Sequence, residues 1–299
     1  MQKGRFLTDK QVAVILLLPV LIILGSVGVI PLVSALQMSL TKTSIISISQ
    51  HKFVGLRNFM DILTNADYWQ IVKNTFLITG IAAAIRLAIA LGLALLLTGT
   101  IIKRGKNLFR SLFILPWLIP GVAMAIVWMW MLGTRVGIIN YLLRSLHLIE
   151  ANLPWLADKM LAKVSVITVF VWGGTPFIMI VLIAGLQTIP QDLIDASRID
   201  GAGYWSRFLF IILPLLRSLM AIAVLLSLIY MFQNFVIIYT LTGGGPGIAT
   251  ETFSLYVYKT AFDIGRIGRA CAIGTTWLMF LLVFAIFYLR SLTGGGKKA

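Results

Sequence analysis

Six long apolar runs dominate this sequence and limit what it can fold into. Each is about 19 to 26 residues long, which is enough α-helix to cross a hydrocarbon core of about 30 Å. The runs lack the alternation of apolar and polar residues that a membrane-spanning β-strand shows. The sequence therefore predicts an all-α integral membrane protein with six transmembrane helices. The predicted spans are residues 12–36, 74–98, 111–133, 164–186, 215–240 and 270–288.

The composition agrees with a membrane protein and excludes several other classes. Hydrophobic residues make up 59% of the chain and charged residues 12%, whereas a soluble domain is about 25% charged. The single cysteine, Cys271, excludes an internal disulfide and a cysteine-based zinc cluster. The net charge of +15 is spread over loops and chain ends, without a basic run interleaved with aromatic residues. This distribution predicts attraction to membrane lipid headgroups and no nucleic-acid partner.

The N-terminal segment carries the signals that set topology. Lys3, Arg5 and Lys10 precede the first apolar run, and residues 33–35 resemble a signal-peptide cleavage site. The run is too long for a signal peptide, so we expect a retained first span. With the N-terminus inside, the basic residues are densest on the inner side, notably between residues 103 and 110. This pattern favours a cytoplasmic N-terminus and a multi-pass protein of the cell membrane.

Several catalytic and nucleotide-binding motifs are missing from the sequence. The segment from Gly99 to Lys106 has the wrong spacing for a phosphate-binding loop, and the two histidines, His51 and His147, lie in different loops. No predicted span contains a carboxylate, although proton-coupled transporters usually carry one. We therefore expect no catalytic residues, no metal and no cofactor on this chain. A membrane channel, a secondary transporter and a membrane-embedded enzyme are the alternative classes.

A polar segment between the fourth and fifth runs contrasts with the apolar chain around it. Pro190 suits the first turn of a helix, and the carboxylates of Asp192 and Asp195 favour a helix N-terminus. Gly201 can adopt positive φ and end that helix, so residues 203–212 are predicted to form a second helix before Pro214. Without further information this is either a hairpin on the membrane surface or a contact for a soluble partner.

The same segment resembles the Glu-Ala-Ala coupling motif of binding-protein-dependent ABC importers. The match runs through Gly201-Ala202 to Leu213-Pro214, with Asp195 in place of the glutamate and Ser197 in place of the second alanine. The resemblance implies the type I ABC importer permease fold and a coupling loop, residues 187–214, that docks an ATPase subunit. The positions implied in that contact are Asp192, Asp195, Ala196, Ser197, Asp200, Gly201, Ala202, Phe208, Leu213 and Pro214.

A second signature resembles the permeases of sugar importers, the group that includes maltose and glycerol-3-phosphate systems. It comprises residues 242–246, 249–252, 258 and 261–262, with further similarity at 53–59 and 74–75. The resemblance implies an outer, scoop-like loop at residues 241–267 that reaches the binding protein, and it favours the subunit type of the larger maltose permease. The implied binding-protein contacts are Gly243, Gly244, Gly245 and Pro246.

The resemblance also implies a domain plan and a set of partners. A cytoplasmic N-terminus (1–11) precedes one six-span permease domain (12–290), and a cytoplasmic tail (291–299) follows it. The implied partners are a second, homologous permease subunit, two ABC ATPase subunits that hold ATP and Mg²⁺, and an extracytoplasmic solute-binding protein. The chain is then a subunit of a heterodimeric importer and not an enzyme itself.

Polar residues within the fourth and fifth spans are candidates for sugar contact. Ser227, Tyr230 and Asn234 recur at the spacing of one helical face, although polar contacts between helices would also explain them. The Gly173–Pro176 stretch is either a cavity wall or an ordinary kink. The family resemblance implies sugar contacts at these and neighbouring positions, where Phe170 and Met231 replace amide side chains. The full set is Phe170, Gly173, Gly174, Phe177, Ser227, Tyr230, Met231 and Asn234.

Arg86 is the one charge placed deep within a predicted span. Inserting an arginine at the centre of a span costs about 2.5 to 3.5 kcal/mol on translocon scales, so it should face the helix bundle. It is either a counter-ion for an anionic sugar or a structural group bonded to carbonyls or to the partner subunit. We favour the structural role.

Overall fold

The computed structural model describes residues 8–47, 52–99 and 105–294. Residues 1–7 of the predicted N-terminal segment, residues 103 and 104 of the basic stretch 103–110, and residues 295–299 of the predicted tail lie outside the described residues. The chain forms two compact units, each described separately below. Unit 1 comprises Met1–Asn65 and Val257–Val283, and unit 2 comprises Ala66–Tyr256 and Phe284–Ala299.

Unit 1 contains the first span, a small hairpin and the start of the last span. Its elements are α1 (Asp9–Leu24), the π-helical turn η1 (Gly25–Val29), α2 (Ile30–Ser39), β1 (Thr41–Lys42), the 3₁₀ turn η2 (Ile45–Ser47), β2 (Lys52–Phe53), α3 (Arg57–Leu63), the π-helical turn η4 (Lys259–Asp263) and the first part of α14 (Ile267–Gly294).

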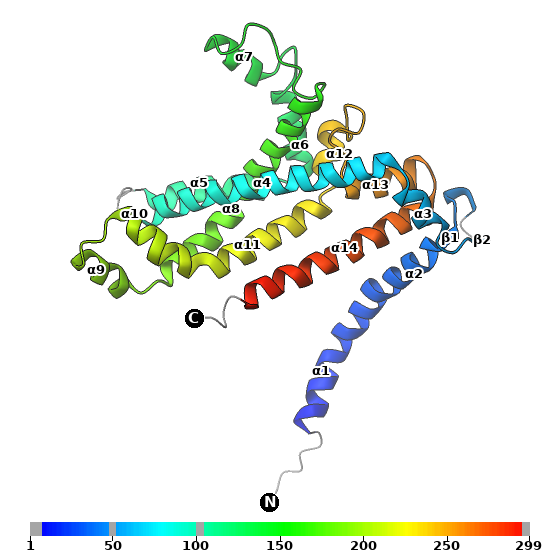
Figure 1. The fold of residues 1–299 in the computed structure, drawn as a ribbon, viewed down its shortest axis with the longest axis horizontal. Helices are drawn as coiled ribbons and strands as arrows, with labels where there is room; N and C mark the ends of the chain where they lie inside the picture. The colour runs from blue at the N-terminus through cyan, green and yellow to red at the C-terminus, as the bar shows by residue number, and fades with distance from the viewer. Residues whose placement is uncertain (1–7, 48–51, 100–104, 295–299) are drawn as a thin grey trace, which may run out of the picture. The chain divides into compact units, whose positions relative to one another are not determined.

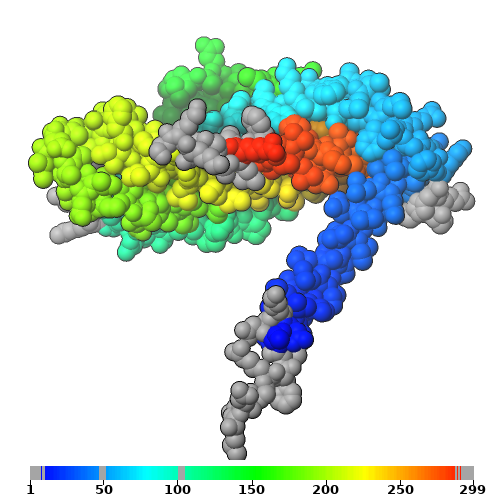
Figure 2. All heavy atoms as spheres, turned by 60° about the horizontal axis from the view of Figure 1, so that its bottom comes forward, coloured from blue at the N-terminus to red at the C-terminus, as the bar shows by residue number. Residues whose placement is uncertain are grey.

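The first span begins at a capping box and runs without a break into the hairpin. Thr8 accepts a hydrogen bond from the backbone N–H of Gln11, whose side-chain oxygen accepts one from the Thr8 N–H. Figure 2 shows α1 and α2 as one continuous rod of side chains. Strands β1 and β2 pair antiparallel, with Thr41 opposite Phe53. The Asn58 side chain then donates to the carbonyls of Ser39 and Thr41, which fixes α3 against the end of the span.

Unit 2 contains the elements in which the site residues were predicted. They are α4 (Ala66–Thr98), α5 (Lys106–Leu118), α6 (Gly121–Met131), α7 (Ile138–Ser145), α8 (Lys159–Gln187), α9 (Gln191–Ile199), α10 (Tyr204–Arg207), the π-helical turn η3 (Phe208–Ile212), α11 (Leu213–Gln233), α12 (Val236–Thr242) and α13 (Phe253–Tyr258), which extends into unit 1.

The core of unit 2 lies where α4, α8 and α11 pack together. Ala90 and Ala94 of α4, Met179 and Leu182 of α8, and Ala223 of α11 are all fully buried there. Small alanine side chains let membrane helices approach closely, which is how such helices associate without a hydrophobic driving force. Figure 1 shows these helices running alongside one another, with α9 and α10 at one end of α11 and α12 at the other.

The predicted all-helical membrane fold is confirmed, with one sharp departure in the third span. Within the described residues, five helices are long and apolar enough to cross a membrane. The predicted span 111–133 is instead two helices, α5 and α6, bent by 96°. The break falls at Ile119, whose backbone is extended (ψ 127°) because Pro120 follows it and disfavours the helical conformation. Counting the bent pair as one span restores six.

The fifth span also differs from its predicted boundaries at both ends. Tyr204–Gln233 is a single helical run, so the separate helix expected at 203–212 is continuous with the span. Pro214 lies in the first turn of α11, directly after the π-helical turn η3, and the helical run continues through it. At the other end, the helix stops at Gln233 instead of continuing to residue 240.

Candidate functional site

A cavity of about 360 Å³ lies among the helices of unit 2. It contains six of the eight predicted sugar-contact positions, which come from α8 and α11. Helices α4, α5, α6 and α12 complete the wall. The lining residues are Arg86, Trp117, Ile119, Gly121, Met124, Val169, Phe170, Gly173, Gly174, Phe177, Leu226, Ser227, Tyr230 and Ile237.

Met231 and Asn234 are the two predicted sugar-contact positions outside this lining. Met231 is buried within the helix packing. Asn234 follows the last residue of α11 in an extended conformation, and its side-chain oxygen accepts a hydrogen bond of 3.1 Å from the backbone N–H of Ile237. The expectation that Asn234 shares one helical face with Ser227 and Tyr230 is therefore wrong, because the helix ends before it. A sugar contact by Asn234 or Met231 remains a prediction.

The Arg86 guanidinium forms part of the cavity wall and bonds three helices together. Its Nε donates to the carbonyl oxygen of Phe170 at 2.7 Å, and its Nη2 donates to the same oxygen. Its Nη1 donates to the hydroxyl of Ser227 at 2.8 Å. The Phe170 ring also faces the charge, with its centroid 5.9 Å from Cζ. Arg86 of α4 is thereby tied to α8 and α11, as a structural role requires.

Arg86 also keeps donors for the cavity. A guanidinium carries five N–H groups, and the three bonds above leave two without a partner among the described residues. The side chain is only 2% exposed, so these donors face the enclosed space and not bulk water.

Two glycines of α8 make room for this arrangement. A side-chain carbon at Gly174 would overlap the Arg86 guanidinium, and one at Gly173 would lie 2.7 Å from the Met124 side chain of α6. The helix itself continues through Pro176 to Gln187. The Gly173–Pro176 stretch was predicted to be either a cavity wall or an ordinary kink, and Gly173 and Gly174 do line the cavity.

The cavity suits a ligand with both apolar faces and hydroxyl groups. The Trp117 and Phe177 rings lie 5.9 Å apart at its wall, and the hydroxyls of Ser227 and Tyr230 supply polar atoms. Trp117 and Met124 were not predicted as site residues. They reach the cavity because the chain turns sharply at Pro120, and that proline was the signal in the sequence that could have found them.

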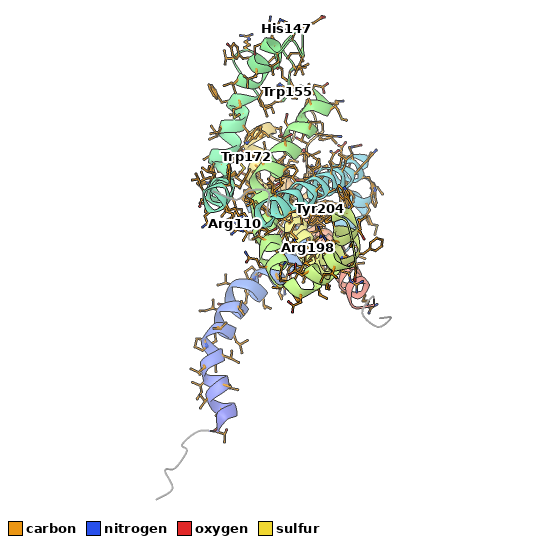
Figure 3. The ribbon with its side chains drawn as sticks, turned by 90° about the vertical axis from the view of Figure 1, so that its left-hand side faces the viewer. Arg110, His147, Trp155, Trp172, Arg198 and Tyr204 are labelled. Atoms are coloured by element: carbon orange, nitrogen blue, oxygen red, sulfur yellow. The ribbon has the colours of Figure 1, made fainter. Side chains whose placement is uncertain are left out.

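The coupling segment, defined here as residues 190–214, forms the predicted helix and turn. Helix α9 follows Pro190, and Gly201 adopts positive φ (77°) as it ends the turn after α9. Asp195 forms an exposed ion pair of 2.7 Å with Arg198 on the same helix. Arg198 on α9 and Tyr204 on α10 both lie on the side of unit 2 that faces the viewer in Figure 3.

Exposed apolar side chains accompany these charges. Ile199 is 88% exposed, Trp205 70% and Phe210 77%. Ile199 lies on the polar segment, whereas Trp205 and Phe210 lie in the run Tyr204–Gln233, which is apolar enough to cross a membrane. These three residues were not predicted, although their large apolar side chains were visible in the sequence.

The glycine-rich loop is a turn held by several hydrogen bonds. Gly243 and Gly244 have positive φ, and the Thr250 hydroxyl bonds both the Thr242 hydroxyl (2.7 Å) and the Gly245 carbonyl (2.9 Å). Asn74 of α4 donates to the carbonyl of Ile248 at 2.7 Å, which anchors the loop to the helix layer. These bonds define the shape of the loop, and the binding-protein contact at Gly243, Gly244, Gly245 and Pro246 stays a prediction.

A family model and several known proteins match this chain. The model describes an inner membrane component of binding-protein-dependent transport systems and matches residues 88–292. The trehalose/maltose transport system permease protein MalF of Thermococcus litoralis is 32% identical over 282 residues, covering 94% of each protein. The sulfoquinovosyl glycerol transport system permease protein SmoG of Agrobacterium fabrum is 30% identical over 284 residues, covering 95% of this chain and 91% of that protein.

Solved structures share the fold. A chain of a bacterial ABC transporter involved in the import of the acidic polysaccharide alginate superposes with a TM-score of 0.82 at 21% identity. The match covers 94% of this chain and 95% of that chain. A second structure, of the bacterial alginate ABC transporter in complex with its pentasaccharide-bound periplasmic protein, gives a TM-score of 0.77 at 20% identity, with 93% and 92% covered.

Proposed function

Because the chain belongs to the family of inner membrane components of binding-protein-dependent transport systems, we propose that it carries a sugar or sugar derivative as one permease subunit of an ATP-driven importer. The observation that carries the proposal is the unit 2 cavity, where six of the eight positions expected to contact sugar lie together. The names of the relatives, which include trehalose/maltose and sulfoquinovosyl glycerol systems, support a carbohydrate class.

The sugar passes through the cavity with its apolar faces against Trp117 and Phe177. Ring stacking of this kind suits the C–H surfaces of a sugar, and the hydroxyls of Ser227 and Tyr230 suit its OH groups. Among the described residues that line the cavity none is a carboxylate. A proton-coupled mechanism usually needs one within the membrane, which disfavours a secondary transporter.

The coupling segment docks one of two partner ATPase subunits, which hold ATP and Mg²⁺. Its exposed Ile199 and Trp205 provide apolar contact area, and Asp195 provides an acid for a basic partner residue. The second docking site is the equivalent segment of a homologous permease subunit. This division of roles makes the chain a transport subunit and leaves ATP hydrolysis to its partners.

The solute-binding protein docks at the opposite face of the membrane. The glycine-rich loop and the coupling segment lie at opposite ends of α11 (Figure 1). With the coupling segment in the cytoplasm, the loop faces the outside and the N-terminus is cytoplasmic. Gly243 to Pro246 then form the contact with the binding protein.

Two matched hydroxyl deletions test the path of the sugar. Tyr230→Phe removes a hydroxyl at the cavity wall, and Tyr239→Phe removes one from α12 outside the lining. Losing a hydrogen bond to substrate costs about 1 to 3 kcal/mol, so Tyr230→Phe should lower uptake into proteoliposomes about 5- to 150-fold. Tyr239→Phe should leave uptake near wild type. Equal uptake by both variants would place the sugar elsewhere.

A further inference from the structure

A second cavity, of about 470 Å³, lies within unit 1 and carries a strong positive charge. Four of its side chains are basic and one is acidic, which gives a net charge of +3 for the lining. The lining residues are Lys42, Thr43, Ser44, Val54, Arg57, Asn58, Asp61, Ile264, Arg266 and Arg269. The proposed sugar path uses none of the four cations. Arg57 falls within the family-like stretch 53–59 and Arg266 within the predicted outer loop 241–267, but neither was given a role there.

Backbone bonds hold the walls of this cavity in place. The N–H of Gly268 donates to the carbonyl of Thr43 at 3.0 Å, and the N–H of Ile45 donates to the carbonyl of Gly265 at 2.9 Å. The side chain of Asn58, on α3, donates hydrogen bonds to the carbonyls of Ser39 and Thr41 at the end of the first span. The end of α2, the helix α3 and the start of α14 are therefore joined around the cavity, so its cations are positioned by the fold.

The cations lack the partners that a purely structural role would give them. Within the described residues, no carboxylate forms an ion pair with Lys42, Arg57, Arg266 or Arg269. The Nε of Arg269 is buried and has no hydrogen-bond acceptor among those residues. A buried donor without a partner lowers the stability of the fold by about 1 to 3 kcal/mol. We therefore expect a hydrogen-bond acceptor from outside the chain.

The depth of the cavity indicates where this acceptor comes from. Lys42 lies three residues beyond the end of the span Gln11–Ser39, and Arg266 and Arg269 flank the first residue of the span Ile267–Ile286. Residues 40–42 leave the helix and enter strand β1, so Lys42 lies at most about 10 Å beyond the span, whereas Arg266 and Arg269 lie at the start of theirs. Each headgroup layer is about 5 to 7 Å thick. The charges therefore lie at the level of lipid phosphates. An acidic group of a docking protein would instead meet charges further out in water.

We propose that the unit 1 cavity binds the phosphate of an anionic phospholipid. Guanidinium groups such as those of Arg266 and Arg269 bind phosphate oxygens in a bidentate manner. Ile264, which is 59% exposed at the wall, and Val54 offer apolar contact for the glycerol and the start of the acyl chains. The proposal does not depend on the identity of the sugar or on which leaflet supplies the lipid.

Native mass spectrometry of the assembled importer in detergent tests this site. We expect phosphatidylglycerol to bind in preference to phosphatidylcholine. Each basic residue near a headgroup contributes about fivefold to binding, so Arg266→Gln with Arg269→Gln should weaken phosphatidylglycerol binding about 25-fold. Arg266→Lys with Arg269→Lys keeps both charges and should retain binding to within about fivefold, which separates loss of the site from misfolding.

A matched pair in unit 2 serves as the control. Arg135→Gln with Arg144→Gln also removes two guanidinium groups from the lining of one cavity, and it should leave phosphatidylglycerol binding unchanged. The proposal is overturned if the unit 1 glutamine pair has no effect or if the control pair has the same effect. It is also overturned if inorganic phosphate alone occupies the site as tightly as the lipid does. Finally, it is overturned if the unit 1 pair weakens docking of the solute-binding protein while lipid binding stays intact.

Discussion

Two charged groups of unit 2 lie in opposite environments. Arg86 is 2% exposed, and three of its N–H groups are bonded to Phe170 and Ser227 on neighbouring helices. Asp195 and Arg198 are each about half exposed and bond one another on a single short helix. The first arrangement joins three helices, while the second joins only two side chains one turn apart.

The difference shows how a membrane protein divides its charges between stability and contact. A buried charge needs hydrogen-bond partners inside the protein, because an unpartnered one is costly, and Arg86 makes three such bonds. An exposed i,i+3 ion pair contributes only about 0.3 to 0.5 kcal/mol, so Asp195 can exchange Arg198 for a partner's cation at little cost. Arg86 should therefore govern assembly, and Asp195 should govern coupling.

Arg86→Gln should have the largest effect on stability. Hydrogen bonds to a charged group contribute about 1.5 to 3 kcal/mol each, and glutamine cannot reach both Phe170 and Ser227 in the same geometry. We expect a loss of about 3 kcal/mol or more, seen as a lower melting temperature and less assembled complex for every substrate alike. A fully assembled variant that loses only an anionic sugar would instead make Arg86 a counter-ion.

Gly174→Ala should have a smaller effect on the same three-helix contact. The added carbon overlaps the Arg86 guanidinium, and overpacking of this kind costs about 1 to 3 kcal/mol. Gly92→Ala on α4 is the control, because a side-chain carbon there meets nothing within 4 Å. It should be neutral or slightly stabilising. Equal melting temperatures for the two variants would contradict the claim that Gly174 makes room for the Arg86 guanidinium.

Asp195→Lys should have the smallest effect on stability and a large effect on coupling. It removes an exposed ion pair, so the melting temperature should hardly change. It also presents a cation where the ATPase is expected to offer one, and like charges at an interface cost several kcal/mol. Binding-protein-stimulated ATP hydrolysis and uptake should both fall. Wild-type uptake at equal membrane abundance would leave the segment as a surface hairpin.

The sequence was sufficient for the parts of the fold that follow from local pattern. Long apolar runs predicted the spans, and Gly201 predicted the turn after α9, which its positive φ confirms. The six predicted positions that line the cavity lie on helices whose interior is regular, so positions implied by the family resemblance fall together around one cavity. Their contact with sugar stays a prediction.

Features that depend on helix breaks and on packing partners were not predictable. Pro120 was a visible sign of a break in the third span, but the size of the bend, 96°, and the entry of Trp117 and Met124 into the cavity do not follow from one proline. From the sequence, Asn234 could either continue α11 or cap α12. In the structure its side-chain oxygen accepts a hydrogen bond from the N–H of Ile237, as a cap of α12 does. The partners of Arg86 lie 84 and 141 residues away in the sequence, beyond any local pattern.

Protection of a cysteine by substrate tests most directly whether the unit 2 cavity carries the sugar. Tyr230→Cys, in a background where the only native cysteine is removed by Cys271→Ser, places a thiol at the cavity wall. Sugar trapped in the assembled importer should slow its reaction with a small thiol reagent, by about tenfold at about 90% occupancy. Tyr239→Cys, outside the lining, should react at an unchanged rate. An unchanged rate at position 230 with sugar bound would contradict the account.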